Sequence, residues 1–244
     1  MTNAEIRERC LTPFWEQQEL FEKRIYPDIE KHRKGNFRIQ VTDQNGKPQA
    51  GVTVSLRQQT HDFKYGANIF MLDEFPTEAE NAAYRDLFHR YFNLATVPFY
   101  WDGIEPREGQ PRYAANSEKV YRRPAPDLCV EYCREHGILP KLHCLFYDKF
   151  TPDWLPKTDE AAMRRLYEKR FAEIAERYGD KLYEVEAINE MLEEQYWTTQ
   201  SVLCGQHDIV EWVFALARKY FPHSRLVFNE GCRVPMIAAA DYRD

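Results

Sequence analysis

The sequence predicts an α/β fold built from successive βα units. Five short apolar runs, rich in β-branched and aromatic residues, alternate with longer segments of helical periodicity. The runs cover residues 65–70, 93–97, 138–146, 182–188 and 225–228. Short connections between such units require right-handed crossovers and a parallel sheet, which is either open and doubly wound or closed into a (β/α)8 barrel. No GxGxxG or GxxxxGK[ST] motif follows any run, so a nucleotide-binding open sheet loses its main support.

A helix and a β-hairpin are expected ahead of the βα repeats. Residues 14–34 carry a helical charge pattern that Pro27 interrupts and Gly35 closes. The basic run at residues 31–34 lies where cations favour a helix C-terminus, which is a better explanation than a nucleic-acid patch. Residues 37–59 alternate in polarity around Asn45-Gly46, a dipeptide typical of hairpin turns. We therefore divide the chain into an extension, residues 1–60, and a βα domain, residues 61–244.

Four amphipathic helices are expected to cover the sheet. They span residues 77–92, 127–137, 161–179 and 207–222, and Thr77 and Glu80 have the spacing of a capping box. Glycines at positions 137 and 179 end two of them. The residues expected to face the core are Tyr84, Leu87, Phe88 and Tyr91 in the first helix, Met163, Leu166, Tyr167, Ile174 and Tyr178 in the third, and Ile209, Val213, Leu216 and Tyr220 in the fourth.

The charge balance limits the classes of partner. With 39 acidic and 33 basic residues the formal charge is -6, which argues against a general electrostatic affinity for nucleic acid or an anionic membrane. The first residues lack the apolar core of a signal peptide, and no run reaches the ~18–20 apolar residues of a membrane span. We expect a soluble protein, cytoplasmic as given or secreted if a leader was removed, with a neutral or weakly charged ligand.

The cysteines raise the question of a metal site. Six are scattered over a chain too long to need disulfide staples, which agrees with a reducing compartment. Cys129, Cys133 and His136 fall on one face of a predicted helix. Because no second cysteine pair or matching ligand cluster accompanies them, the pattern favours buried free thiols. We expect no metal and no other cofactor.

Polar and aromatic residues follow the last three predicted strands. In both possible architectures ligands meet the carboxyl ends of the strands, where side chains can point into a crevice. Carboxylates and amides exchange hydrogen bonds with hydroxyl groups, and aromatic rings cover apolar sugar faces, so such an edge suits a hydroxyl-rich ligand. The residues are His143, Tyr147, Asp148 and Trp154 after the third strand, Asn189 and Glu190 after the fourth, and Asn229 and Glu230 after the fifth.

Each of these residues also has a purely structural explanation. Glu190 could be an acid in the first turn of a helix, where the dipole favours it. His143 could be a hydrogen-bonded core histidine, and Trp154 could close the end of a barrel. Their gathering at one edge favours a site over these separate explanations.

Several motifs along the chain resemble glycoside hydrolase family 10, the family of endo-1,4-β-xylanases. The resemblance extends from about residue 30 to residue 231 and implies a (β/α)8 TIM barrel that cleaves a β-1,4-linked plant polysaccharide such as xylan with retention of configuration. The motifs are "FNLATVPFYWDGIEPREGQ", "KLHCLFYDKFTPDWL", "RFAEIAERYGDKLYEVEAINE", "EAINE" and "RLVFNEG".

The resemblance assigns roles to the residues at the strand ends. Glu190 matches the general acid/base, which protonates the departing oxygen while a second carboxylate attacks the anomeric carbon. Asn189 matches the amide that binds the sugar 2-hydroxyl, and His143 matches the histidine beside the scissile bond. The resemblance also leads us to expect Trp101, Tyr147, Trp154 and Asn229 to bind substrate. Trp154 lies in the family's P-x-W-L element, and Asn229 matches the asparagine of its fifth strand.

The chain departs from the family pattern at two strand ends. The second strand of the family usually ends in Thr-x-Glu-Asn-x-x-Lys-Trp, whose polar residues grip the sugars on the non-reducing side. This chain has Pro98, Phe99 and Tyr100 there, so the substrate is expected to be a decorated or different glycan. After the third strand, Tyr147 and Asp148 stand in place of the usual Trp and His.

The chain is shorter than the family's barrel. Only five strands are expected, whereas a (β/α)8 domain takes ~250 residues and the family's nucleophile follows the seventh strand. Glu230 is a poor substitute, because an adjacent strand does not readily place it across the sugar from Glu190. We therefore expect the front part of a longer protein, without hydrolytic turnover by itself and with an open sheet edge available for self-association.

Two other functions fit the same residues. A non-catalytic carbohydrate-binding protein would keep Asn189 and the aromatic residues while lacking the chemistry. A βα scaffold for protein association would use only the open edge of the sheet.

Overall fold

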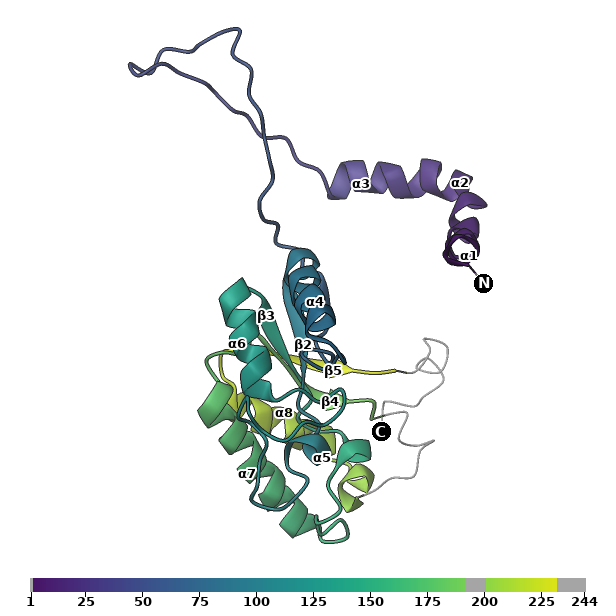
Figure 1. Ribbon diagram of the computed structural model, residues 1–244, viewed down its shortest axis with the longest axis vertical. Helices are drawn as coiled ribbons and strands as arrows, with labels where there is room; N and C mark the ends of the chain where they lie inside the picture. Colours follow the sequence, from purple (N-terminus) through teal and green to yellow (C-terminus); the bar gives the residue numbers. More distant parts are fainter. Residues whose placement is uncertain (1, 192–200, 232–244) are drawn as a thin grey trace. The chain divides into compact units, whose positions relative to one another are not determined.

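The computed structural model describes residues 2–191 and 201–231 of the chain (Figure 1). The chain forms two compact units, residues 1–61 and 62–244. Within the described ranges, no helix is both long and apolar enough to cross a membrane.

The N-terminal unit begins with helices. These are α1 (Asn3–Trp15), α2 (Gln18–Leu20), a π-helical turn η1 (Phe21–Ile25) and α3 (Tyr26–His32). Thr2 and Glu5 form a capping box that starts α1, so the helical region begins earlier than expected. Pro27 was expected to interrupt the helix, but the helical backbone continues through it. It lies in the first turn of α3, where the missing N–H matters least, and the wider turn η1 precedes it.

The predicted hairpin is reduced to its turn. The Asp43 carboxylate accepts hydrogen bonds from the backbone N–H groups of Asn45 and Lys47, both at 2.9 Å. Gly46 adopts a φ of 79°, and one antiparallel bridge joins Thr42 to Pro48. Among the described residues of this unit no strand extends beyond that bridge. Two strands alone are marginally stable in water, and the proline at position 48 contributes no N–H to a ladder, so the expected alternating runs do not form an extended pair.

The second unit consists of βα repeats, as predicted. Its five strands are all parallel and their order in the sheet follows the chain. The strands are β1 (Gly66–Asn68), β2 (Leu94–Pro98), β3 (Leu139–His143), β4 (Glu184–Asn189) and β5 (Arg225–Asn229). The helices between them are α4 (Glu78–Tyr91), α5 (Trp101–Ile104), α6 (Pro126–His136), η2 (Asp148–Phe150), α7 (Glu160–Tyr178), η4 (Val202–Gly205) and α8 (Ile209–Tyr220).

The helices cover the sheet through the apolar stripes that their sequences predict, with one correction. α6 packs against β2 and β3, and α8 packs against β4 and β5 (Figure 1). In α4 only Phe88 of the predicted stripe is fully buried, whereas Leu87 is 47% exposed and Tyr91 is 66% exposed. Tyr84 is half-buried beside Phe88. The contact face of α4 is therefore narrower than its hydrophobic pattern suggests.

The cysteines of α6 are part of the core. Cys129 and Cys133 are both fully buried, and burial raises the pKa of the Cys133 thiol to about 12. His136 stacks on His89 instead, with ring centroids 4.3 Å apart. Among the residues that the structure describes, these three side chains do not gather as metal ligands. Cys232 lies outside the described residues.

Candidate functional site

The carboxyl ends of the strands meet at one edge of the sheet. Pro98 at the end of β2 is in register with His143 at the end of β3, and Asn189 at the end of β4 is in register with Asn229 at the end of β5. This edge, called the rim below, therefore brings together residues that are far apart in the sequence.

Glu190 is the first residue after β4 and its side chain is half-buried at the rim. Its backbone lies in the left-handed region with a φ of 51°, which is uncommon for a residue other than glycine. Its N–H donates to the Asn229 carbonyl oxygen at 2.8 Å. The Tyr147 hydroxyl donates to Oε2 of Glu190, and burial, reinforced by this hydrogen bond, raises the pKa of Tyr147. The carboxyl group is thus held against a phenol that stays protonated.

Asn189 and Asn229 form an amide pair beside Glu190. Nδ2 of Asn229 donates to Oδ1 of Asn189 at 2.7 Å, and Asn189 is almost fully buried. The bond uses the carbonyl oxygen of Asn189 and leaves its amide N–H groups to act as donors at the rim. An amide so oriented can donate to a sugar hydroxyl.

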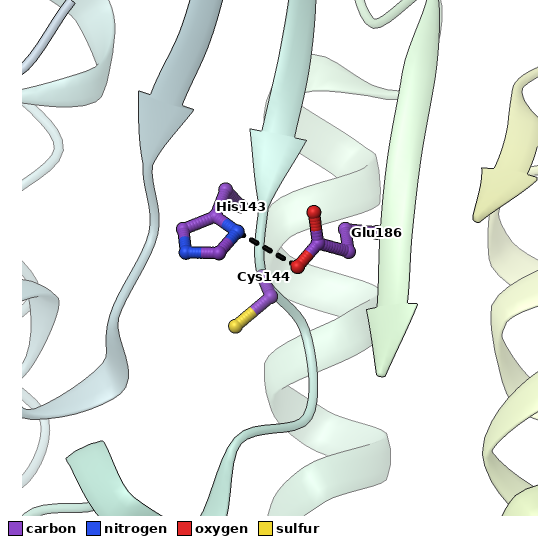
Figure 2. A group of neighbouring side chains, drawn as sticks. All are labelled: His143, Cys144 and Glu186. Carbon is purple, nitrogen blue, oxygen red and sulfur yellow. Dashed lines mark hydrogen bonds and ion pairs between the residues drawn. The ribbon is translucent and has the colours of Figure 1, made fainter. Parts of the chain in front are cut away.

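His143 belongs to a chain of polar groups on one face of the sheet (Figure 2). Its Nδ1 lies 2.8 Å from Oε1 of Glu186, and its Nε2 lies 2.8 Å from the Tyr100 hydroxyl. Because a carboxylate can only accept, Nδ1 donates, and in a neutral ring Nε2 accepts from the phenol. The Lys141 ammonium, 2.8 Å from Oε2 of Glu186, balances the buried charge. The orientation of the imidazole is therefore fixed from both sides.

Glu186, Lys141 and Tyr100 were not among the residues expected at the site. Glu186 is only 1% exposed, within a strand that also buries Val185, Ala187 and Ile188. The sequence does carry a signal for it, because side chains two apart in a strand share a face. Lys141 and His143 alternate with buried Leu142, and Glu184 and Glu186 alternate in the neighbouring strand. The two polar alternations predict one polar face across β3 and β4.

The side chains around His143 also have the composition of a metal site. One ligand atom each from His143, Cys144 and Glu186 lies within 4.8 Å of the others, close enough to surround a metal ion (Figure 2). Both imidazole nitrogens and both Glu186 oxygens already have protein partners, and one partner is the Lys141 ammonium, which would repel a cation. The geometry therefore favours a hydrogen-bonded network over a metal centre.

The two tryptophans expected at the site lie in different surroundings. Trp101 is 4% exposed and packs edge-on against Tyr167, so it belongs to the core and offers little surface for a sugar to stack on. Its indole N–H donates to the Glu105 carboxylate at 2.9 Å. Trp154 is half-buried, donates to the Glu105 carbonyl oxygen at 2.9 Å and meets Trp101 edge-to-face. Of the two, Trp154 retains a surface that a ligand could contact.

Aromatic rings line the β2 side of the rim. The Tyr100 ring lies 4.8 Å from Phe150 and 6.2 Å from Tyr147, measured between centroids. A cavity of about 450 Å3 opens beside Tyr100. A larger hollow of about 830 Å3 lies elsewhere, between α6 and α7 near the amino end of β3, and shares no residue with the rim.

Comparison with known proteins relates the sequence of this chain to a protein family. The sequence model of glycosyl hydrolase family 10 matches residues 60–231. The endo-1,4-beta-xylanase 5-like protein of Arabidopsis thaliana is 26% identical over 208 residues, which are 83% of this chain and 33% of that protein. The anti-sigma-I factor RsgI6 of Acetivibrio thermocellus is 23% identical over 205 residues, which are 82% of this chain and 24% of that protein.

The fold agrees with a solved structure of the same family. The crystal structure of xylanase 10B from Thermotoga petrophila in complex with xylobiose superposes with a TM-score of 0.54 and 17% identity, over 68% of this chain and 49% of that one. The five described βα units thus correspond to part of a (β/α)8 barrel. The chain spans about a third of the length of the Arabidopsis relative and about half of the solved chain. By the extent of the family match, this chain belongs to glycosyl hydrolase family 10.

Proposed function

We propose that this chain carries the acid/base half of a retaining glycoside hydrolase that acts on a β-1,4-linked plant polysaccharide such as xylan. The observation that carries the proposal is the position of Glu190, held at the rim by Tyr147 and flanked by the amide of Asn189. The similarity to endo-1,4-beta-xylanases supports the substrate class.

The proposed reaction assigns a step to each of these groups. Glu190 gives its proton to the glycosidic oxygen as the bond to the anomeric carbon breaks, and a second carboxylate ~5–5.5 Å away attacks that carbon. Glu190 then removes a proton from the water that hydrolyses the glycosyl intermediate. Asn189 donates to the sugar 2-hydroxyl, a bond that strengthens in the transition state. His143, oriented by Glu186 and Tyr100, borders the sugar at the scissile bond.

We propose that none of the other described carboxylates at the rim serves as the nucleophile. Glu186 is buried and engaged by Lys141 and His143. Asp148 is buried and accepts a hydrogen bond from the Ser201 N–H at 2.8 Å. Glu230 comes directly after β5, the strand next to the one that carries Glu190. It is therefore not expected to reach the opposite side of a bound sugar. The chain alone is therefore expected to show no appreciable hydrolysis.

Hydrolysis of aryl β-xylobiosides tests this proposal. The chain should be inactive, whereas a longer form that continues through the rest of a family 10 barrel should turn over. Equal, high activity of the two forms would contradict the proposed absence of a nucleophile.

The role of Glu190 is tested in the longer form by leaving-group dependence. Glu190→Gln should lower turnover of unactivated xylo-oligosaccharides by about 10²–10⁴-fold. Its effect on the first step with a dinitrophenyl leaving group should be much smaller, because that group departs without a proton. The matched control, Glu176→Gln at an exposed position of α7, should leave the turnover of both substrates unchanged. A loss that is the same for both leaving groups would show that Glu190 is not the acid.

A second candidate function is sugar binding without catalysis. One relative is named as an anti-sigma-I factor and not as a xylanase, which supports this second candidate. Titration of xylo-oligosaccharides into the chain by calorimetry should then show saturable binding with no product, also in a longer form. Product formed by the longer form would leave the hydrolase as the function.

We also propose that the open sheet can support self-association. Within the described part of the chain, β1 and β5 each pair with a single neighbouring strand. An unpaired strand edge offers N–H and C=O groups to another chain. Sedimentation should detect a dimer or larger oligomer, and a monomer at all concentrations would refute this proposal.

A further inference from the structure

A cavity on the β1–β2 side of the rim is lined by the side chain of Arg123 and by aromatic rings. Its volume is about 450 Å3, within the range of small-ligand pockets. Phe70, two residues after β1, and Tyr100, two residues after β2, place it at the carboxyl ends of the strands. Arg123 reaches it from the segment between α5 and α6.

Arg123 is held in the cavity by aromatic rings. Its guanidinium carbon lies 3.9 Å from the centroid of the Tyr100 ring, 5.4 Å from that of Phe150 and 5.9 Å from that of Phe70. Burial lowers the pKa of Arg123, but a guanidinium remains charged in proteins. The rings fix the plane of the cation and so reduce the entropy lost when it binds a ligand.

The hydrogen-bonding capacity of Arg123 is mostly unused. Its one side-chain hydrogen bond among the described residues runs from Nη1 to the carbonyl oxygen of Arg122, at 3.1 Å. No carboxylate of the described residues lies within the 4.0 Å of an ion pair. Asp102 also lines the cavity, so with Arg122 the three charged side chains sum to one positive charge. A cation with free donors in a net positive cavity suits a ligand with one negative charge.

The cavity adjoins the proposed catalytic residues through Tyr100. One face of its ring lies under Arg123, and its hydroxyl bonds to His143 at 2.8 Å. The same ring lies 6.2 Å from that of Tyr147, which holds Glu190. A sugar beside His143 would therefore bring its substituents within reach of Arg123.

We propose that this cavity binds a uronosyl group of the glycan, with the sugar's carboxylate on the guanidinium of Arg123. The planar fork of the guanidinium matches a carboxylate in two parallel hydrogen bonds, and the rings offer apolar faces to the sugar. Apolar and aromatic residues replace the polar end of the second strand in this chain, and the cation of Arg123 supplies polar recognition there. This inference rests on the proposed function and narrows its substrate class to acidic glycans.

Paired ligands test the inference in the 244-residue chain. Calorimetry would compare a xylo-oligosaccharide bearing one glucuronosyl side group with the same compound after reduction of the carboxylate to an alcohol. The acidic form should bind about 10- to 100-fold more tightly, the range of a charge-assisted hydrogen bond. Arg123→Gln should bring this ratio close to one, and Arg123→Lys should keep part of it.

A charge-matched control separates recognition from packing. Arg90→Gln removes a positive charge from the exposed face of α4 and should leave the ratio unchanged. If Arg123 merely packs on Tyr100, Arg123→Gln should weaken both ligands equally and preserve the ratio, which would overturn the inference. Equal affinities of the wild type for the two ligands would overturn it as well, while leaving the proposed function intact. If neither ligand binds, the inference fails, and hydrolysis by the longer form decides the proposed function separately.

Discussion

Replacing Lys141 by methionine should strongly destabilise the second unit. The Lys141 ammonium lies 2.8 Å from Oε2 of Glu186, whose carboxylate is 1% exposed. Removing one partner of a buried ion pair costs about 3–5 kcal/mol, because the other charge stays buried without compensation. At about 2–4 °C per kcal/mol for a domain of this size, the melting temperature should fall by about 6–20 °C.

Urea denaturation followed by circular dichroism measures this loss. The matched control is Lys219→Met, because Lys219 lies 2.7 Å from Glu168 but both side chains are well exposed, at 59% and 46%. That pair should contribute about 0.2–1 kcal/mol. The double variant Lys141→Met/Glu186→Gln should be less destabilised than the sum of its single variants, by about 0.5–3 kcal/mol. A cost for Lys141→Met as small as that of Lys219→Met would refute the argument from burial.

Three further predictions concern the fold. Leu142→Ala, at a fully buried position of β3, should cost about 2–5 kcal/mol in urea denaturation, whereas Leu142→Met should cost less than about 1.5 kcal/mol; similar costs would contradict tight packing there. Thr77→Ala should lower the free energy of unfolding by about 1 kcal/mol, because it removes the N-cap of α4, whereas Thr77→Ser should keep the cap and most of the stability. An equal loss in both variants would argue against capping. Although burial opposes it, hydrogen bonds from Arg177 and Tyr178 lower the pKa of Asp127. A lowered carboxyl pKa stabilises the fold above the unfolded value of about 3.9, and this contribution disappears as the pH falls through the folded value. Arg177→Met should therefore flatten the acid dependence of the urea midpoint below about pH 4, and an unchanged profile would contradict the role of this pair.

The main features of the fold follow from hydrophobic periodicity. Each of the five predicted strands forms, because strand residues such as those of β3 bury alternate side chains under helices. The boundaries lie within two residues of the predicted ones except at the end of the third run, which was expected to reach residue 146 whereas β3 ends at His143. The predicted core-facing stripe of α4 was too wide, since a helix can bury only the part of an apolar stripe that neighbouring elements cover. Leu87 and Tyr91 lie beyond that part. The N-terminal hairpin was overestimated, because alternation indicates a strand only where a partner strand or a core is available.

The site was only partly predictable. Glu190, Asn189 and His143 could be placed at the rim because the ends of parallel strands meet at one edge. Glu186, which bonds to His143, has a signal in the polar alternation of β4. Tyr100 has none, since it reaches His143 through side-chain geometry that no local pattern encodes. Trp101 shows the opposite limit. It was expected to bind substrate, but a large aromatic ring near a strand end can also pack in the core, and Trp101 is only 4% exposed.

The left-handed backbone at Glu190 means that the residue best for stability at this position, glycine, lacks a carboxyl group. A side chain with a β-carbon costs about 1–2 kcal/mol in this conformation, whereas glycine adopts it freely. Selection of variants for heat resistance alone would therefore favour glycine at position 190 and discard the proposed proton donor. The presence of glutamate at position 190 therefore indicates selection for a property other than thermal stability.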